Sequence, residues 1–182
     1  MGTRGVNEVL KFWFDSLQPQ DWFAKSDRLD QQIAQCFGAL HQRLVSTKDD
    51  ALLQSPEQAL VAVIVLDQFS RNLFRDQPEA FAQDDKALAI ARAAIERQWD
   101  QLLPPRQRAF LYMPFMHSER LEDHEQAMAL FTELGNEKNL EFERKHKVII
   151  ERFGRYPHRN AVLGRESTPE ERAFLTQPGS SF

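Results

Sequence analysis

The segment SPEQALVAVIVLDQFSRNLFRD, Ser55 to Asp76, decides the fold that we predict for this sequence of 182 residues. Ser55 and Pro56 are typical of a helix start, because serine caps the first turn and proline tolerates the first helical position. Every residue from Ala59 to Leu66 is apolar. A helix that is apolar all round is surrounded by protein, so we expect this one to be buried.

Charged residues follow this apolar run at helical spacing. Asp67, Arg71 and Arg75 are four residues apart, so they share one face of the helix. One interpretation is an ion-pair ladder in which the arginines also complement the negative end of the helix dipole. The other is a functional site, since buried charges are costly unless they are fully partnered. The sequence leaves both interpretations open.

The flanking segments also carry apolar residues at spacings of three and four, which indicates helices on both sides. No sustained alternation of period two is present, so we expect no strands. The sequence predicts an all-α fold, a tetratricopeptide-like array of antiparallel helical hairpins, in a single domain over residues 1–182. The further helices are expected at about 6–14, 27–44, 84–95, 106–113 (ending at Pro114), 127–134 (closed by Gly135), 138–153 and 168–175.

Bulk composition limits the classes of partner. Twenty-three basic and 27 acidic residues give a formal net charge of −4, so no general attraction to nucleic acid or to an anionic membrane is expected. The longest apolar run, Ala59 to Leu66, is shorter than the roughly 20 residues of a membrane helix. The N-terminus has no secretory signal pattern. We expect a cytoplasmic protein, and its oligomeric state stays open.

Two apolar features have a structural and a functional interpretation. Cys36 lies between Ile33 and Leu40 on a predicted helix face, so we expect a core position rather than a catalytic thiol. Trp22 and Phe23 follow the first helix in a turn. They are either a hydrophobic plug over the core, which we favour, or an exposed contact patch.

The segment RFGRYPHRNAVLGR, Arg152 to Arg165, concentrates four arginines and His158 around two glycines. Glycine permits positive φ and Pro157 fixes a turn, so we expect a shaped loop rather than a helix. Loops of this kind carry functional sites more often than packed elements do.

Our first hypothesis is that the polar residues at helix ends and breaks form one pocket for a small anion, a phosphate or a carboxylate. Imidazole titrates near neutral pH, so a histidine would be the general acid or base and a carboxylate would orient it. The candidate catalytic residues are His158, His117, Glu119 and Asp67. The candidate ligand contacts are Arg71, Arg75, Asn72, His146, Arg155, Arg159 and Asn160.

Two other hypotheses use the same residues. A helical array can hold a peptide, and its arginines could recognise an acidic peptide terminus. Alternatively, the network of Arg, Asp and Glu is structural and pins a loop over the core. The hypotheses differ in the role of His146, which lies on the apolar face of its predicted helix with Phe142, Ile149 and Ile150. Its position predicts a hydrogen-bonded core residue, whereas the first hypothesis makes it a ligand contact. Whether the protein is an enzyme stays open.

A metal site is a weaker variant of the first hypothesis. Its ligands would be His117, Glu119, His124 and His158, but their spacing matches no standard set and nearby arginines would repel a cation. The sequence lacks an HExxH motif, a zinc-type cysteine set, a glycine-rich phosphate loop and a GxSxG motif. We therefore expect no metal and no cofactor.

Several long motifs resemble a known family. They are VLKFWF (9–14), the Trp22–Phe23 turn, LDQFSRNLFRDQPEAFAQD (66–84), FLYMPFMHSE (110–119), His146, RFGRYPHRNAVLGR (152–165), STPEE (167–171), AFL (173–175) and Phe182. This pattern is similar to the bacterial domain of unknown function family 924, whose members are placed in the tetratricopeptide-like helical superfamily. The resemblance implies a helical-hairpin fold and no particular reaction. The chain departs from the family pattern at Asp123–Glu125, which reads DHE, so His124 is left out of the predicted site.

Overall fold

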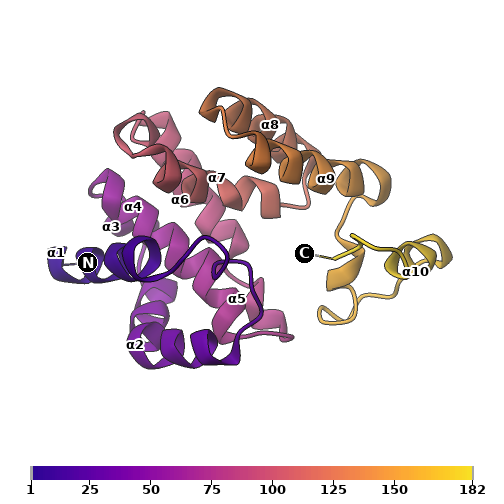
Figure 1. Ribbon diagram of the computed structural model, residues 1–182, viewed down its shortest axis with the longest axis horizontal. Helices are drawn as coiled ribbons and strands as arrows, with labels where there is room; N and C mark the ends of the chain where they lie inside the picture. The colour runs from indigo at the N-terminus through magenta and orange to yellow at the C-terminus, as the bar shows by residue number, and fades with distance from the viewer. Residues whose placement is uncertain (1, 182) are drawn as a thin grey trace. The chain divides into compact units, whose positions relative to one another are not determined.

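The structure is a computed structural model that describes residues 2–181. All regular structure among these residues is helical, which confirms the predicted all-α class (Figure 1). Phe182, one of the residues that carry the family resemblance, lies outside the described residues. No helix of the described chain is long and apolar enough to cross a membrane.

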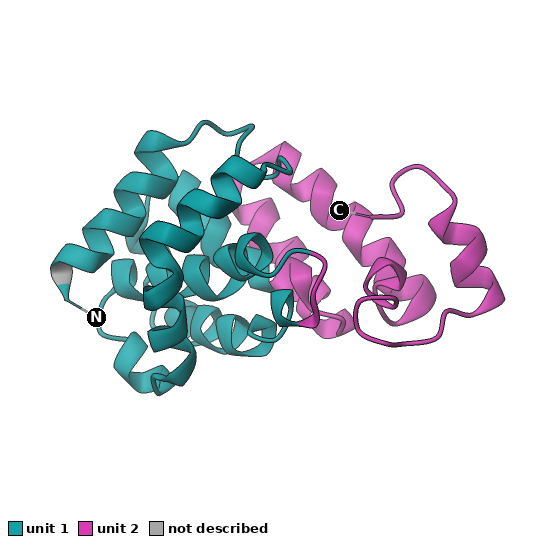
Figure 2. Ribbon diagram, turned by 90° about the horizontal axis from the view of Figure 1, so that it is seen from below, with its two compact units in different colours: residues 1–75, 79–114 teal, residues 76–78, 115–182 magenta. Residues whose placement is uncertain are grey.

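The chain divides into two compact units (Figure 2). The first unit contains the residues up to 75 together with 79–114, and the second contains 76–78 and the residues from 115 onward. The assignment of residues 1–182 to a single domain stays a prediction, because a domain can contain more than one compact unit.

The central helical segment of the first unit begins at the predicted position. The side chain of Ser55 accepts a hydrogen bond from the Gln58 amide at 3.2 Å, and Pro56 occupies the first helical turn. All residues from 59 to 66 are at most 1% exposed, as expected for a helix that is apolar all round. The elements up to α7 are α1 (Thr3–Leu10), η1 (Lys11–Ser16), α2 (Asp27–Ser46), α3 (Asp49–Leu52), α4 (Pro56–Val63), η2 (Ile64–Phe69), α5 (Ser70–Leu73), η3 (Pro78–Ala80), α6 (Asp84–Glu96), η4 (Asp100–Leu102) and α7 (Pro105–His117).

Two segments of the first unit wind as π-helix, η1 and η2. All of η2 is buried, and η1 buries Phe12, Trp13 and Phe14. The Trp13 ring lies 5.4 Å from the Phe69 ring of η2 and 5.7 Å from that of Phe110. A π turn holds an additional residue, so it changes the direction in which the following side chains point. The sequence carries no signal for either π segment, and neither was predicted.

Three predictions about the helices are wrong. Helix α7 continues through Pro114 to His117 instead of ending at Met113. Proline is compatible with helical φ, and residues 109–116 are all buried, so packing outweighs the lost hydrogen bond. Cys36 is exposed because it lies at the edge of the helix face that α2 buries. Phe142 is 43% exposed, so it lies outside the buried face of its helix, and that face is narrower than the predicted apolar stripe.

The Trp22–Phe23 turn covers the core with one of its two side chains, and the role of the exposed one as a contact patch stays a prediction. Trp22 is half-buried, its indole nitrogen donates to the Trp13 carbonyl at 2.9 Å, and its ring lies 4.8 Å from Phe110. Phe23 is 65% exposed although its ring stacks on Phe110. The plug is therefore Trp22 alone.

The second unit contains the end of α7, the helices α8 (Leu121–Leu134) and α9 (Glu137–Phe153), the short turn η5 (Pro157–Arg159) and α10 (Pro169–Leu175). Helices α8 and α9 lie side by side as an antiparallel hairpin (Figure 1). Gly135 ends α8 with φ 71°, the left-handed conformation that was predicted for this position. The wider tetratricopeptide-like arrangement stays a prediction.

Candidate functional site

The predicted site residues divide between the two units. Those in the first unit are Asp67, Arg71, Asn72 and Arg75. Those in the second unit are His117, Glu119, His146, Arg155, His158, Arg159 and Asn160. The single pocket of the first hypothesis stays a prediction.

In the first unit, Arg71 binds two carboxylates. Its Nη1 lies 2.8 Å from Oδ1 of the fully buried Asp67, and this contact is the predicted i,i+4 ion pair. The same guanidinium makes a bidentate contact with Asp84 of α6, at 2.9 and 3.0 Å. Gln68 donates to the other Asp67 oxygen at 2.6 Å. Arg71 therefore links η2 to α6.

Arg75 and Asn72 both contact Asp30 of α2. Arg75 donates through Nε and Nη2 at 2.7 and 2.8 Å, and the Asn72 amide donates at 2.8 Å. Burial would raise the pKa of Asp30, but these hydrogen bonds and the Arg75 charge outweigh it, and the pKa is lowered. The three side chains connect α5 and the turn that follows it to α2.

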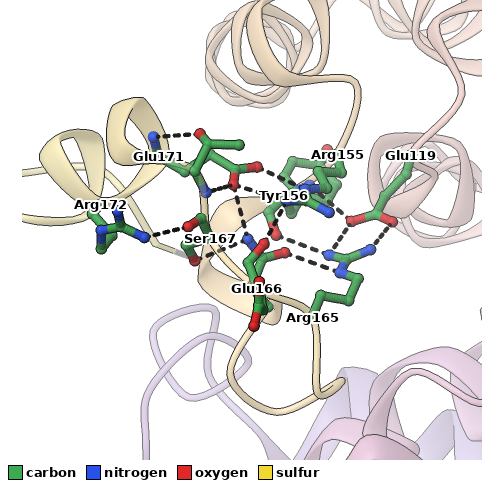
Figure 3. Close-up of polar contacts among 10 residues, drawn as sticks. Glu119, Arg155, Tyr156, Arg165, Glu166, Ser167, Glu171 and Arg172 are labelled. Carbon is green, nitrogen blue, oxygen red and sulfur yellow. Dashed lines mark hydrogen bonds and ion pairs between the residues drawn. The ribbon is translucent and has the colours of Figure 1, made fainter.

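In the second unit, Arg155 fixes the loop to α10 (Figure 3). It donates to both oxygens of Glu171 at 2.7 and 2.8 Å. Chiefly because of this contact, the pKa of Glu171 is lowered to about 2. The Asn160 amide donates to the same carboxylate at 3.3 Å, and Glu171 completes a capping box with Thr168. The ion pair between Arg155 and Glu171 therefore holds this end of the loop against α10.

Arg165 fixes the other end of the loop to Glu119, on the opposite side of Tyr156 in Figure 3. Its two terminal nitrogens donate to the two Glu119 oxygens at 2.7 and 2.9 Å, and the Tyr156 amide donates to Oε1 at 2.8 Å. Burial would raise the pKa of Glu119, but these bonds and the charges of Arg165 and Arg159 lower it. Glu119 is therefore ionised at neutral pH and suits the predicted orienting role better than that of a proton donor.

Tyr156 is the centre around which imidazole rings gather. The sequence contains five histidines, and His124, His146 and His158 lie 6.2, 5.7 and 5.5 Å from the fully buried Tyr156 ring. The Arg159 guanidinium lies 4.6 Å from the centre of the same ring.

The end of α7 also belongs to this region. Arg159 is 7% exposed and donates to the backbone carbonyl of His117 at 3.0 Å. The side chain of His117 is half-buried, as is that of His158. His146, His158 and Arg159 were predicted as site residues and lie around Tyr156. His117 was predicted too, and its backbone carbonyl joins them through Arg159.

His146 is neutral over the physiological pH range. Its Nδ1–H donates to the Phe142 carbonyl at 2.8 Å, so Nε2 is the basic nitrogen of the ring. Burial lowers its pKa to about 3, and the charges of His117, His124 and His158 act in the same direction. The prediction of a core position for His146 is confirmed, because it is 6% exposed.

Sequence reasoning missed His124 and Glu143, which form a buried pair at 2.7 Å between Nδ1 and Oε1. The other nitrogen of His124 lies 2.8 Å from the Ser118 carbonyl oxygen. Glu143 could have been found, because it is three residues before His146 and shares its face of α9. No local pattern indicates that His124 would face it from α8.

No group of three or more His, Cys, Asp or Glu side chains is arranged to hold a metal ion among residues 2–181. The fold and the side chains around Tyr156 define an all-helical protein with a histidine-rich and arginine-rich centre in its second unit.

The comparisons with known proteins agree with this description. The sequence profile of a bacterial protein of unknown function (DUF924) matches residues 9–179, so the chain belongs to this family and the predicted resemblance is confirmed. The solved structure of a protein of unknown function from Agrobacterium tumefaciens is similar, with a TM-score of 0.89 and 36% sequence identity. The match covers 94% of this chain and 97% of that one. No functionally curated protein matches the sequence.

Proposed function

We propose that this protein is a cytoplasmic binder of a small oxyanion, a phosphate or a carboxylate, and that it binds the anion in its second unit. The site is the Tyr156 cluster, which we define as Tyr156, His117, His146, His158 and Arg159. The observation that carries the proposal is the gathering of imidazoles and a guanidinium around one buried tyrosine. Such groups are the usual ligands of phosphate and carboxylate in proteins.

The charges around the loop support an anion at Arg159. The charges of Arg165 and Arg159 both lower the pKa of Glu119, while Arg165 holds both oxygens of that carboxylate. Two guanidiniums therefore act on one carboxylate, so the electrostatic potential near Arg159 favours an anion. Arg71, Arg75 and Arg155 make ion pairs with Asp84, Asp30 and Glu171, which fits a structural role, so we leave these three out of the proposed site.

Acid–base chemistry at this site would fall to His158 or His117. Both are half-buried, so protons can exchange with solvent, and imidazole has an ordinary pKa of about 6.5. His146 is neutral with its proton on Nδ1, so through Nε2 it could accept a hydrogen bond from a protonated oxygen of a hydrogen phosphate and could not bind an ionised carboxylate oxygen. Glu119 would orient the loop as a carboxylate and would not donate a proton.

Titration of the purified protein with inorganic phosphate and with a library of phosphorylated and carboxylated metabolites tests the proposal. We expect saturable binding by the wild type, a loss of at least about tenfold in affinity for Arg159→Met, and a smaller loss for His158→Ala, because a charged hydrogen bond contributes more than a neutral one. Arg144→Met is the matched control, because Arg144 is exposed on α9 with its nearest carboxylate, Glu137, 3.9 Å away. Thermal shifts that stay unchanged across the whole library would contradict the proposal.

A further inference from the structure

His124 and Glu143 lie next to the Tyr156 cluster and are both fully buried, at 0% side-chain exposure. We propose that they share a single proton as an electrically neutral pair, and that this pair positions the hydroxyl of Tyr156. They are positioning residues rather than catalytic ones. Their importance for anion binding rests on the proposed function, but the state of the pair does not.

The hydrogen bonds of His124 determine where its protons lie. The Ser118 carbonyl can only accept a hydrogen bond, so the 2.8 Å contact requires a proton on Nε2 of His124. The 2.7 Å contact between Nδ1 and Glu143 Oε1 then requires one more proton between these two atoms. Whether this proton is on nitrogen or on oxygen, the pair binds the same number of protons and has no net charge.

The surroundings of Glu143 disfavour an unshared carboxylate. Burial raises the pKa of Glu143, although the contact with His124 and the charge of Lys147 act in the opposite direction. Its second oxygen, Oε2, is buried and has no hydrogen-bond partner among the described residues. Loss of the shared proton would leave a net negative charge there, and a further proton would leave a net positive charge. Both are costly in a buried position.

The pair acts on Tyr156 through His124. The Tyr156 hydroxyl donates to the Met116 carbonyl at 2.6 Å and lies 3.3 Å from Nε2 of His124. The Nε2–H group therefore faces both the Ser118 carbonyl and the Tyr156 oxygen. The titratable and charged groups near the pair include His117 on α7, Arg120 before α8, Asp123 on α8, His146 and Lys147 on α9, and His158 and Arg159 in the loop.

A shared proton has a measurable consequence for stability. Above about pH 6.5 the unfolded chain has an ionised glutamate and a neutral histidine, so it binds one proton fewer than the folded pair. Stability must then fall as pH rises, as for any group whose pKa is raised on folding, and the folding equilibrium constant falls about tenfold per pH unit. His41 and His146, whose pKa values burial lowers, affect stability only below the ordinary histidine pKa.

The test compares urea unfolding of the wild type and Glu143→Gln between pH 7 and 8.5. The glutamine amide can donate to Nδ1 of His124 without carrying a titratable proton, so we expect the variant to fold and to lose the wild-type slope with pH. Equal slopes for the two proteins would overturn the shared proton.

The positioning role is read from the NMR signals of the Tyr156 ring. We expect the Tyr156 ring to keep its wild-type chemical shifts in Glu143→Gln. Its chemical shifts should change in Glu143→Leu, which removes the partner of Nδ1. Unshifted signals in the leucine variant would overturn the positioning role. If Glu143→Leu does not fold, His124→Gln replaces it with the same expectation and the same contrary result. None of these measurements uses a ligand, so a failure of the wild type to bind phosphate would contradict the proposed function and leave this inference standing.

Discussion

The guanidinium of Arg159 lies 4.6 Å from the centre of the Tyr156 ring, at a position where it is 7% exposed. A cation over an aromatic face is attracted by the negative π-surface, so the ring holds the guanidinium in place. The guanidinium also donates to the backbone carbonyl of His117 at 3.0 Å, so the ring and this carbonyl fix where the positive charge of Arg159 lies. Arg155 and Arg165 each make a bidentate contact with a glutamate.

The first prediction concerns Glu119. Glu119→Gln should lower the free energy of unfolding by about 1–3 kcal/mol, because it leaves the half-buried Arg165 without its charged partner. Urea denaturation at pH 7 measures the change. Glu125→Gln is the control, since Glu125 is exposed on α8; an equal loss in both variants would contradict the organising role of Glu119.

The second prediction concerns acid stability at the other end of the loop. The pKa of Glu171 is lowered to about 2, so its contribution to stability is present above the ordinary glutamate pKa and is lost as pH falls from about 4.5 toward 2. Arg155→Met should make stability less dependent on pH in this interval. Thermal unfolding measured across it provides the test, and identical profiles for variant and wild type would argue against the assignment.

The third prediction concerns His146. Because its folded pKa is about 3, the unfolded chain binds a proton that the folded chain does not when pH falls below the ordinary value of about 6.5. The folded state should lose up to about 1.4 kcal/mol per pH unit through this group between those values. His146→Gln should reduce the slope of stability against pH in that range. A slope equal to that of the wild type would show that His146 takes up a proton in the folded state.

The fourth prediction concerns the end of α2 in the first unit. The Lys86 ammonium donates to the backbone carbonyls of Leu44 and Val45 at 3.0 and 2.9 Å, and also to that of Thr47. It thereby satisfies carbonyls that a helix leaves without partners at its C-terminus. Lys86→Met should cost about 1–3 kcal/mol in urea denaturation. Lys11→Met, at an exposed position, should cost much less, and equal costs would rule out the capping role.

Most of the fold could be predicted because helix signals are local. Ser55, Gly135 and Thr168 are caps that act within a few residues of their own position, and all three lie where the sequence placed them. The π segments and the continuation of α7 through Pro114 could not be predicted, because tertiary packing decides them rather than local preference.

Less of the candidate site could be predicted. The histidines and arginines were recognised by residue type, but their partners were not. Asp30 is 45 residues from Arg75, and Glu119 is 46 residues from Arg165. Only the folded chain brings such residues together, and for this reason sequence reasoning counted Arg71, Arg75 and Arg155 as ligand contacts.

His124 shows the same limitation in a different form. The departure from the family pattern at residues 123–125 predicts no site role for His124. In the structure it is fully buried, and its two ring nitrogens contact Glu143 and Ser118. The hairpin of α8 and α9 creates this pairing, and the sequence spacing of the two residues does not reveal it.

The central claim is that the Tyr156 cluster binds an oxyanion, and NMR titration with inorganic phosphate tests it most directly. The imidazole signals of His117 and His158 should shift saturably in the wild type and in Arg144→Met, while His41 in the first unit should stay unchanged. In Arg159→Met the same shifts should require at least about tenfold more phosphate, because a charged hydrogen bond is lost. Signals of His117 and His158 that do not move with phosphate, or that move equally in Arg159→Met, would contradict the account.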